Sequence, residues 1–350
     1  MAGKSIVVAG AGGNIGSHLM PHLARMRQVG RVVLIDRDIY ETRNLDNQDI
    51  LPRDVGRPKV EVQARRIVEI RPDIEVVAIH TSLETVPVGI WRADLIVAAL
   101  DSRLARQVVN ERAWRVGVLW VDSGVLASEC LARVNLYSPS SEAPCLECAW
   151  SAEDYKLLEQ QYPCGAGDAP LPTGATSALG ALAASLAALE IGKLLDGETD
   201  SAAIGMQVTL NARGHRLSMM RFRRNPSCRF DHAIWAIEPL RCHLEEMRLK
   251  DLTAHGAASV PGHKFARCRV CAVCGRSDSG FRLERVALQI CCGRAMAVPG
   301  FDVVETLNSE LPTQLLDMPL NEAGLTYGDV VEIDGRYVEI TPKVVMEEAK

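Results

Sequence analysis

Aromatic residues and surplus positive charge are both scarce in this 350-residue chain. Phe, Trp and Tyr make up 5% of the sequence, which is too few for the stacking platforms that bind single-stranded nucleic acid. Acidic residues outnumber basic ones, 44 to 39, and the net charge of -5 does not fit a protein that binds nucleic-acid backbones through positive charge. We therefore expect no nucleic-acid partner.

The chain also lacks an evident targeting signal. Its first residues run straight into an apolar, strand-like stretch without a cleavage site. One uncharged run, 169–189, has the length of a membrane span of about 20 residues. It contains two prolines and many small residues, and Glu190 and Lys193 follow it, which favours a buried helix near 177–195. We expect a cytoplasmic protein with no membrane partner.

Strand and helix patterns alternate along the first part of the chain. Apolar runs predict strands at 5–10, 31–36, 74–79, 94–100 and 118–122, and helical patterns occupy 14–26, 59–70 and the residues after about 103. Such alternation is typical of an α/β fold with a doubly wound, mostly parallel, Rossmann-like sheet and helices on both faces.

This alternation stops near residue 240, and the length suggests about two domains. We expect a nucleotide-binding domain over 1–240 and a smaller β region over 241–350. Residues 328–340 have the pattern of a hairpin, with Asp334 and Gly335 in its turn.

A glycine-rich loop joins the first expected strand to the first expected helix. Its members are Gly10, Gly12, Gly13, Asn14 and Gly16. Glycines allow a tight turn and a close approach to phosphate, while the helix N-terminus supplies amide donors. Asp36 ends the next strand, where a carboxylate can hold ribose hydroxyls. The pattern predicts a nucleotide site.

The loop alone does not decide which nucleotide binds. It is also similar to the opening of NAD-dependent sugar epimerases, which need a Tyr-x-x-x-Lys pair for proton transfer. None of the six tyrosines has a lysine four residues later, and this disfavours an NAD-dependent oxidoreductase.

Motifs after the second strand are more specific. They are Asp36-Arg-Asp38, then Asn44 with Asn47-Gln48, then Lys59, and finally Asp101 after the fourth strand. In this order they resemble the ThiF/MoeB/E1 family of ATP-dependent adenylyltransferases, over roughly residues 5–235. The resemblance implies ATP and Mg²⁺ as ligands and the C-terminal glycine of a ubiquitin-like (β-grasp) or sulfur-carrier protein as the group activated.

The same resemblance implies roles for these residues. Asp36 binds ribose, Asn44 and Lys59 contact phosphates, and Asp101 holds Mg²⁺. Lys59 and Asp101 are the expected catalytic residues of the nucleotide site, because catalysis of phosphoryl chemistry consists largely of positioning groups and neutralising charge. Mg²⁺ commonly takes one or two carboxylates together with phosphate oxygens, which suits one Asp at a strand end.

Two departures from the family pattern bear on activity. The family usually has Asn-x-x-Arg-Gln, and here Asn47 stands at the arginine position, with Arg43, Arg53 and Arg57 as alternative sources of charge. The family also usually has a leading helix whose arginine crosses to the partner subunit, whereas this sequence begins at the first strand. Either the charge is supplied otherwise, for example by another chain, or the activity is weakened; a non-catalytic scaffold is therefore an alternative.

Eleven cysteines, several of them closely spaced, predict metal or thiol chemistry in a reducing compartment. Cys145 and Cys148 resemble the family's first zinc knuckle, and the Asn-Pro-x-Cys start of its second appears at Cys228, with His232 four residues later. Three thiolates and an imidazole would close a tetrahedral structural Zn²⁺ site.

A second cysteine group lies beyond residue 240. Cys271 and Cys274, followed at a distance by Cys291 and Cys292, resemble a zinc ribbon. Because adjacent cysteines rarely both bind one metal, Cys268 is an alternative to one of that pair. Another alternative joins Cys271 and Cys274 to Cys145 and Cys148, although chain order favours Cys228. We expect Cys130 and Cys242 to be buried thiols.

Cys164 lies between the first knuckle and the small-residue helix. In the family this is the crossover loop, where an E1-type cysteine accepts the activated carboxyl group as a thioester, since a thiolate is a strong nucleophile. Some family members adenylate without a thioester, so the alternative is a bystander thiol.

The function implied by the resemblance is that of an E1-like activating enzyme. It would adenylate a ubiquitin-like protein, form a thioester at Cys164, and pass the protein to an E2-like conjugating enzyme, with the C-terminal region as a docking element. The family implies a homodimer. Similar proteins occur in bacterial ubiquitin-like conjugation operons, some of them linked to antiviral defence. The alternatives are activation of a sulfur carrier for thiamin or molybdopterin synthesis, and a ThiF-like scaffold.

Overall fold

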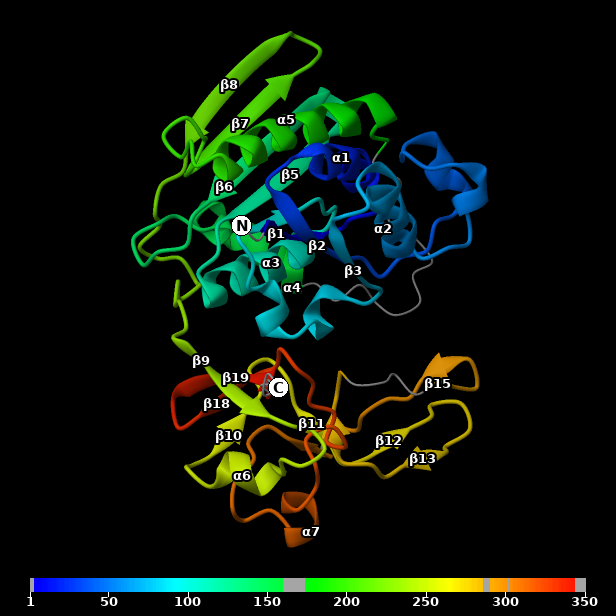
Figure 1. The fold of residues 1–350 in the computed structure, drawn as a ribbon, viewed down its shortest axis with the longest axis vertical. Coiled ribbons are helices and arrows are strands. Elements are labelled where there is room, and N and C mark those ends of the chain that lie inside the picture. The colour runs from blue at the N-terminus through cyan, green and yellow to red at the C-terminus, as the bar shows by residue number, and fades with distance from the viewer. Residues whose placement is uncertain (1–2, 160–173, 286–289, 301, 344–350) are drawn as a thin grey trace, which may run out of the picture. The chain divides into compact units, whose positions relative to one another are not determined.

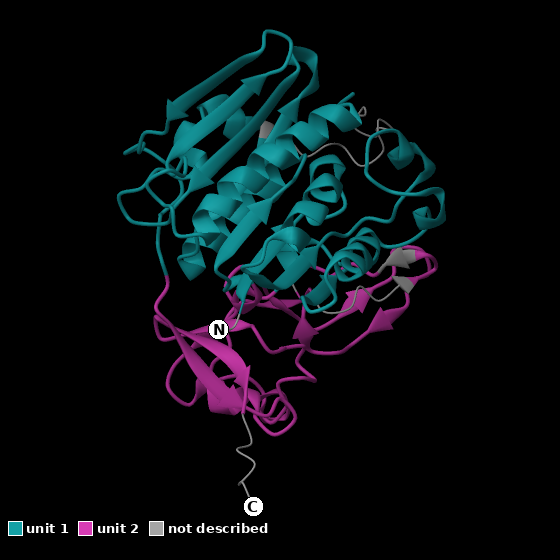
Figure 2. Cartoon of the chain, turned by 45° about the horizontal axis from the view of Figure 1, so that its top comes forward, with its two compact units in different colours: residues 1–86, 91–234 teal, residues 87–90, 235–350 magenta. Residues whose placement is uncertain are grey.

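The computed structural model describes residues 3–159, 174–285, 290–300 and 302–343. The chain forms two compact units, shown in different colours in Figure 2. The first contains Met1–Val86 and Trp91–Ile234, and the second contains Pro87–Ile90 and Trp235–Lys350. In the sequence, the short segment Pro87–Ile90 falls between two stretches of the first unit, yet it belongs to the second. No sequence pattern predicted this.

An eight-stranded sheet forms the centre of the first unit, with the strand order β3-β2-β1-β4-β5-β6-β7-β8 (Figure 1). The strands are β1 Lys4–Ala9, β2 Val29–Ile35, β3 Glu75–Ile79, β4 Leu95–Ala98, β5 Trp120–Leu126, β6 Leu131–Tyr137, β7 Met206–Asn211 and β8 Arg216–Arg221. Strands β1 to β5 pair in parallel, and β6, β7 and β8 continue the sheet in antiparallel pairs. The expected α/β class and mostly parallel sheet are confirmed.

The antiparallel extension was not predicted. The expected fifth strand, 118–122, is replaced by β5, which starts later and continues to Leu126 because its second half pairs with β6. A turn of only a few residues joins β5 to β6, and such a short connection requires an antiparallel pair.

Helices cover both faces of this sheet. They are α1 Asn14–Arg25, α2 Lys59–Ile70, α3 Arg103–Val116, α4 Ala152–Glu159 and α5 Ser177–Leu195. Buried residues of α1, α2 and α5 form one core with alternate residues of the strands, such as Ile6 and Val8 of β1. Helix α3 contacts β4 and β5 but contributes nothing to that core, so it covers the opposite face.

Helix α5 contains residues 177–189 of the uncharged run, for which the sequence favoured a buried helix. Thr176 caps it, its Oγ1 accepting a hydrogen bond from the Leu179 amide at 3.2 Å. Within the described chain it is the one helix long and apolar enough to cross a membrane by length and composition. Here it packs against α1, β5 and β6, which is the position of a core helix.

The strand order determines where a ligand can enter. Strand β1 lies between β2 and β4, so the direction in which the chain winds through the sheet reverses at β1 and β4. At such a switch point the loops beyond the carboxyl ends of the strands diverge and leave a crevice. The glycine loop follows β1 at this position.

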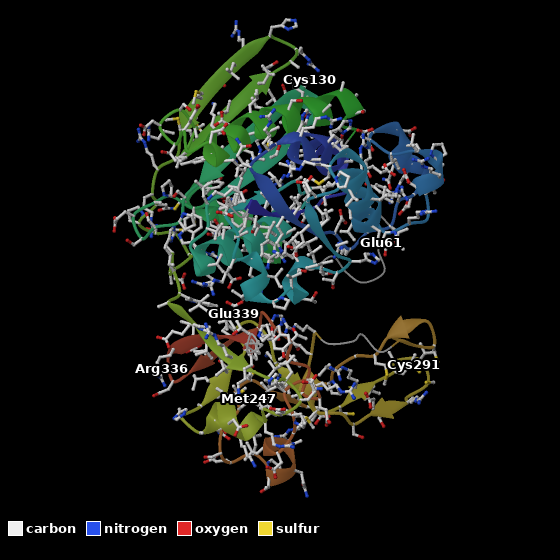
Figure 3. All side chains as sticks on the ribbon, viewed as in Figure 1. Glu61, Cys130, Met247, Cys291, Arg336 and Glu339 are labelled. Carbon is white, nitrogen blue, oxygen red and sulfur yellow. The ribbon has the colours of Figure 1, made fainter. Side chains whose placement is uncertain are left out.

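The second unit consists of small sheets. A four-stranded sheet has the order β10-β18-β19-β9, a three-stranded sheet has the order β14-β11-β17, and β12–β13 and β15–β16 are two-stranded. The elements are β9 Ile237–Cys242, α6 Leu249–Thr253, β10 Ala258–Ser259, β11 Phe265–Ala266, β12 Arg269–Val270, β13 Ser277–Asp278, β14 Arg282–Leu283, β15 Ile290–Cys291, β16 Arg294–Ala295, β17 Val303–Val304, α7 Thr313–Leu316, β18 Val330–Ile333 and β19 Arg336–Pro342. Figure 3 labels Cys291 on the β15 hairpin and Arg336 and Glu339 on β19.

The predicted hairpin near the end of the chain is confirmed. Strands β18 and β19 pair antiparallel, with Ile333 opposite Arg336. Both turn residues have positive φ angles, 49° at Asp334 and 77° at Gly335. This is the conformation of a two-residue type I′ turn, which explains the Asp-Gly sequence.

Candidate functional site

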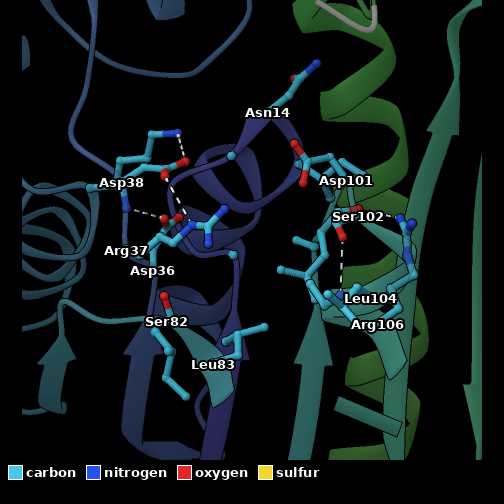
Figure 4. A pocket seen from close by; sticks show the side chains of 18 of the residues that line it. Asn14, Asp36, Arg37, Asp38, Ser82, Leu83, Asp101, Ser102, Leu104 and Arg106 are labelled. Atoms are coloured by element: carbon cyan, nitrogen blue, oxygen red, sulfur yellow. Dashed lines mark hydrogen bonds and ion pairs between the residues drawn. The ribbon is translucent and has the colours of Figure 1, made fainter. Parts of the chain in front are cut away.

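A cavity of about 420 Å³ opens at the carboxyl ends of β1 to β4. Figure 4 shows Asp36, Arg37 and Asp38 on one side of it and Asp101, Ser102 and Arg106 on the other. The candidates from the sequence that line it are Gly10, Gly13, Asn14, Asp36, Asp38, Asn47, Gln48, Lys59 and Asp101. Its volume lies within the range of small-molecule sites, about 300–1,000 Å³.

The remaining candidates lie beside this cavity. Asn44 lines a second hollow of about 320 Å³, which shares Arg37, Asp38 and Lys59 with the first. Gly12 and Gly16 form the turn itself. A side chain at Gly12 would meet Cβ of Lys59 at 2.3 Å, and Gly10 has a φ of 79°. The loop sequence therefore allows the chain to turn closely against α2 and leaves the start of α1 open to the cavity.

The Asp36 carboxylate is held by two backbone amides. The Gly12 amide donates to Oδ2 at 2.9 Å and the Asp38 amide donates to Oδ1 at 3.0 Å. Burial raises the pKa of Asp36, and the Lys59 ammonium opposes this rise. Each carboxylate oxygen has a second lone pair, so Asp36 can accept hydrogen bonds from two ligand hydroxyls at the edge of the cavity.

Lys59 is the first residue of α2, yet its side chain is only 8% exposed. Its Nζ lies 3.2 Å from Oδ2 of Asp38 and 5.7 Å from the centre of the Tyr40 ring. A solvated lysine on a helix surface would not be enclosed in this way. The arrangement holds one ammonium group at the cavity wall, where it can meet an anion.

Asp101 lies at the end of β4, before α3. The helix is capped by Ser102, whose Oγ accepts a hydrogen bond from the Ala105 amide at 3.3 Å. Capping therefore does not use the Asp101 carboxylate, which is exposed at the cavity. One carboxylate facing the place where phosphates would lie fits the oxygen ligands that Mg²⁺ prefers.

Three buried amide oxygens at this cavity have no hydrogen-bond partner among the described residues. They belong to Asn14, Asn47 and Gln48. The amide nitrogens of Asn14 and Asn47 donate to the carbonyl oxygen of Ala175, at 3.3 and 3.4 Å. Buried acceptors are normally satisfied, so these oxygens are exceptions beside the cavity; Oδ1 of Asn14 lies against Gly180 of α5, 1.8 Å from the position that a Cβ there would occupy.

Several cavity residues were missed by the sequence reasoning. Leu83 and Glu84 follow β3, Arg37 separates two predicted aspartates, and Arg106 and Arg133 come from α3 and β6. No motif marks these positions.

None of the three arginines considered as substitutes for Asn47 lines this cavity. Arg43 lines the second hollow and pairs with Glu41 at 2.7 Å. Arg53 and Arg57 line neither of the two.

Asp122 joins two of the missed residues. This carboxylate on β5 is completely buried; it accepts from Nε of Arg106 at 2.7 Å and from Nη1 of Arg133 at 2.8 Å. Burial raises the pKa of Asp122, but the two guanidinium groups lower it by more, so the pKa lies below its ordinary value. Asp122 is therefore ionised at neutral pH.

The first group of metal-ligand candidates comes together as the sequence suggested. The ligand atoms of Cys145, Cys148, Cys228 and His232 all lie within 4.8 Å of one another. Sγ of Cys145 is 3.8 Å from Cys148 and 3.7 Å from Cys228. A tetrahedron with Zn–S bonds of about 2.3 Å has edges of about 3.8 Å. The donor set and its spacing fit Zn²⁺.

His232 is oriented for such a role. Its Nδ1 lies 2.8 Å from the Phe230 carbonyl oxygen, which can only accept, so Nδ1 carries a proton. The Nε2 lone pair then points to the cysteines, 3.4 Å from Sγ of Cys148. A hydrogen bond on the other ring nitrogen fixes metal-ligating histidines in one tautomer in this way.

The second group, Cys271, Cys274, Cys291 and Cys292, also has its sulfur atoms within 4.8 Å of one another. Cys274 and Cys291 are separated by 3.6 Å, and Cys291 and Cys292 by 3.9 Å. Both adjacent cysteines belong to the group, and Cys268 does not. The positive φ of Cys292, 52°, lets the chain turn so that both sulfur atoms face the same point.

The other cysteines have different surroundings. Cys164 lies outside the described residues. Cys242 is buried, as expected. Cys130 is only half-buried, contrary to expectation, because it lies in the exposed turn between β5 and β6.

A doubly wound sheet with a glycine-loop cavity at its switch point defines a nucleotide-binding α/β protein. The chain belongs to the ThiF family, whose model matches residues 2–230. The larger part of the second unit, Trp235–Lys350, lies beyond that match.

The chain is also similar to curated proteins named ubiquitin-like modifier-activating enzyme 5. The protein from Culex quinquefasciatus is 27% identical over 244 residues, which cover 64% of this chain and 58% of that protein. The one from Oryza sativa subsp. japonica is 29% identical over 189 residues, covering 48% and 44%. The chain thus spans about half the length of these relatives.

Among solved structures, the fold resembles that of E. coli MccB. The structure of MccB with ATP matches with a TM-score of 0.53 and 23% identity, covering 65% of this chain and 66% of MccB. A complex of MccB, the microcin C7 biosynthetic enzyme, with N-formylated MccA matches with a TM-score of 0.52 and 22% identity, covering 65% and 67%. At this identity the likeness shows the fold alone.

Proposed function

We propose that this protein is an ATP-dependent adenylyltransferase that activates the C-terminal carboxylate of a ubiquitin-like protein. The observation that carries the proposal is the cavity itself, where the glycine loop, the enclosed Lys59 ammonium and the Asp101 carboxylate face one space. The ThiF family and the MccB structure with ATP support the nucleotide. The relatives named ubiquitin-like modifier-activating enzyme support the kind of acceptor.

The reaction follows from these groups. A carboxylate oxygen of the acceptor attacks the α-phosphorus, a new O–P bond forms, and the bond to pyrophosphate breaks. Amides at the start of α1 and the Lys59 ammonium offset phosphate charge, and Asp36 holds the ribose hydroxyls. Asp101 would hold Mg²⁺, which neutralises the leaving pyrophosphate when it is bound.

A thioester step at Cys164 is the second part of the proposal. The Cys164 sulfur would attack the acyl carbon of the adenylate, AMP would leave, and the acyl group would become a thioester for transfer to an E2-like protein. A band that reducing agent removes, formed by wild type and not by Cys164→Ala, would support this step. Adenylation without such a band would show that the protein adenylates its acceptor and forms no thioester.

Both cysteine groups are proposed to bind Zn²⁺ in structural roles, because four protein ligands leave no open position for catalysis. Free thiols in such groups suit a reducing cytoplasm, which we propose as the compartment. A homodimer is proposed from the family resemblance, and sedimentation analysis can test it.

The test of adenylation is ATP–pyrophosphate exchange. Ubiquitin-like proteins of the same organism that end in glycine are the acceptors, and the matched control lacks that glycine. Exchange that needs the terminal glycine supports the proposal. Exchange with a thiamin or molybdopterin sulfur carrier alone would favour the sulfur-carrier alternative, and no exchange with any acceptor would favour a scaffold.

A further inference from the structure

A row of charged groups runs along one wall of the cavity, outside the motifs already assigned. Arg106 and Arg133 both line the cavity, and both donate to the buried Asp122 carboxylate. Arg106 also donates through Nη2 to the carbonyl oxygen of Leu100. These contacts fix both guanidinium groups relative to the sheet, as a preformed site requires.

This row carries more positive charge than it neutralises. Asp122 is the one carboxylate within ion-pair distance of either guanidinium in the described part of the chain. Two arginines and one carboxylate leave a net charge of +1. The side chains of Arg106 and Arg133 are only 12% and 29% exposed, so water screens this charge poorly. A partly buried, uncompensated charge is costly unless an anion accompanies it.

The two arginines line the same cavity as Gly10 and Gly13 of the glycine loop. Leu100, to which Arg106 is bonded, has its Cδ2 atom 2.9 Å from the position that a Cβ at Gly10 would occupy. Arg133 stands opposite Gly124 in the β5–β6 pair, and a side chain at Gly124 would meet its guanidinium at 3.0 Å. The absence of a side chain at Gly124 therefore leaves room for Arg133 to lie against β5 and face the cavity.

We propose that Arg106 and Arg133, held on Asp122, form an anion site that binds the triphosphate of the nucleotide. The inference rests on the proposed function, which supplies the nucleoside triphosphate as the ligand. The anion site would place a positive charge on the β5–β6 side of the cavity, whereas Asn47, which stands at the family's arginine position, carries no charge. Arg133 is the residue that makes the row cationic, because Arg106 and Asp122 alone would be neutral.

The test compares ATP·Mg²⁺ with adenosine as probes, by calorimetry on the full chain. Arg133→Gln should weaken ATP·Mg²⁺ binding about tenfold or more, the typical loss of one charge-assisted hydrogen bond, and leave adenosine binding unchanged. Arg133→Lys should retain part of the affinity. Arg31→Gln is the matched control, because Arg31 pairs with Glu75 on the surface and does not line the cavity. In the Arg133→Gln background, Asn47→Arg should restore affinity for ATP·Mg²⁺ by returning a cation to the same cavity.

The outcomes separate this inference from the function on which it rests. Equal affinity of wild type and Arg133→Gln for ATP·Mg²⁺ would refute the anion site and leave the adenylation proposal intact. A parallel loss of adenosine and ATP binding would show a structural role and would also overturn it. Wild type that does not bind ATP·Mg²⁺ would overturn both. The Asp122–Arg106 pair stays neutral in Arg133→Gln, so the variant is expected to fold, which circular dichroism can check.

Discussion

Replacing Lys59 by Met tests the nucleotide site most selectively. Methionine retains most of the aliphatic stem that packs over Gly12 and removes only the ammonium group. A charge-assisted hydrogen bond contributes about 1.5–3 kcal/mol, so affinity for ATP·Mg²⁺ should fall about ten- to a hundredfold. Calorimetry measures this directly. Affinity unchanged within twofold would refute the assignment of Lys59 to the phosphates.

The same variant should change stability only slightly. The partner Asp38 is 56% exposed, and a screened pair of this kind contributes at most about 1 kcal/mol. Lys4→Met is the matched control, because Lys4 also pairs with an aspartate, at 2.8 Å, but begins β1 at the end away from the cavity. It should leave ATP binding unaltered. A large loss of stability in Lys59→Met would mean that lost binding reflects unfolding.

The effect of Lys59→Met on stability should depend on pH. Burial raises the pKa of Asp36 above 3.8, and Lys59 limits the rise. A carboxyl group whose pKa is higher in the folded protein than in the unfolded chain stabilises the fold when it is protonated. This contribution to the free energy of unfolding is complete below the unfolded pKa and is lost as the pH rises through the folded pKa. Without Lys59 the folded pKa rises further. The stability difference from wild type should be small below pH 3.8 and larger at neutral pH, as denaturant unfolding can measure.

Three further predictions concern the metals and the second unit. The purified protein should contain two equivalents of Zn²⁺ by elemental analysis; Cys228→Ser and Cys274→Ser should each lose one, and Cys130→Ser none. Asp101→Asn should abolish the enhancement of ATP binding by Mg²⁺ and leave metal-free binding intact; an unchanged Mg²⁺ dependence would contradict its role. Gly335→Val should lower the free energy of unfolding by about 1 kcal/mol or more, because its φ of 77° excludes a β-branched residue, whereas Glu332→Gln on the neighbouring strand should be nearly neutral.

Local patterns predicted much of the first unit. Helices α2 and α5 begin and end at the predicted residues, because Pro58 and Thr176 start them and apolar spacing continues through them. The cysteine spacing also predicted the close pairs within both four-ligand groups, since a tight turn brings nearby cysteines together; the joining of distant pairs into one group came from the resemblance to zinc knuckles and to a zinc ribbon. These features depend on a few neighbouring residues and are therefore visible in a sequence.

The features that the sequence missed depend on distant contacts. Strand β8 is exposed along its whole length, so no buried face marks it as a strand. Arg106 and Arg133 meet only because Asp122 lies between them on β5, and neither residue belongs to a local motif. Pro87–Ile90 joins the second unit through pairing such as the Gly89 amide with the Gly328 carbonyl, at 2.8 Å. Separations of this size leave no short-range pattern.

The most direct test of the central claim is calorimetry of wild type with ATP·Mg²⁺ and, separately, with NAD⁺. We expect ATP·Mg²⁺ to bind, Lys59→Met and Asp101→Asn to weaken that binding, and NAD⁺ to give no comparable signal. Binding of NAD⁺ without binding of ATP·Mg²⁺ would contradict the assignment of this cavity to adenylation.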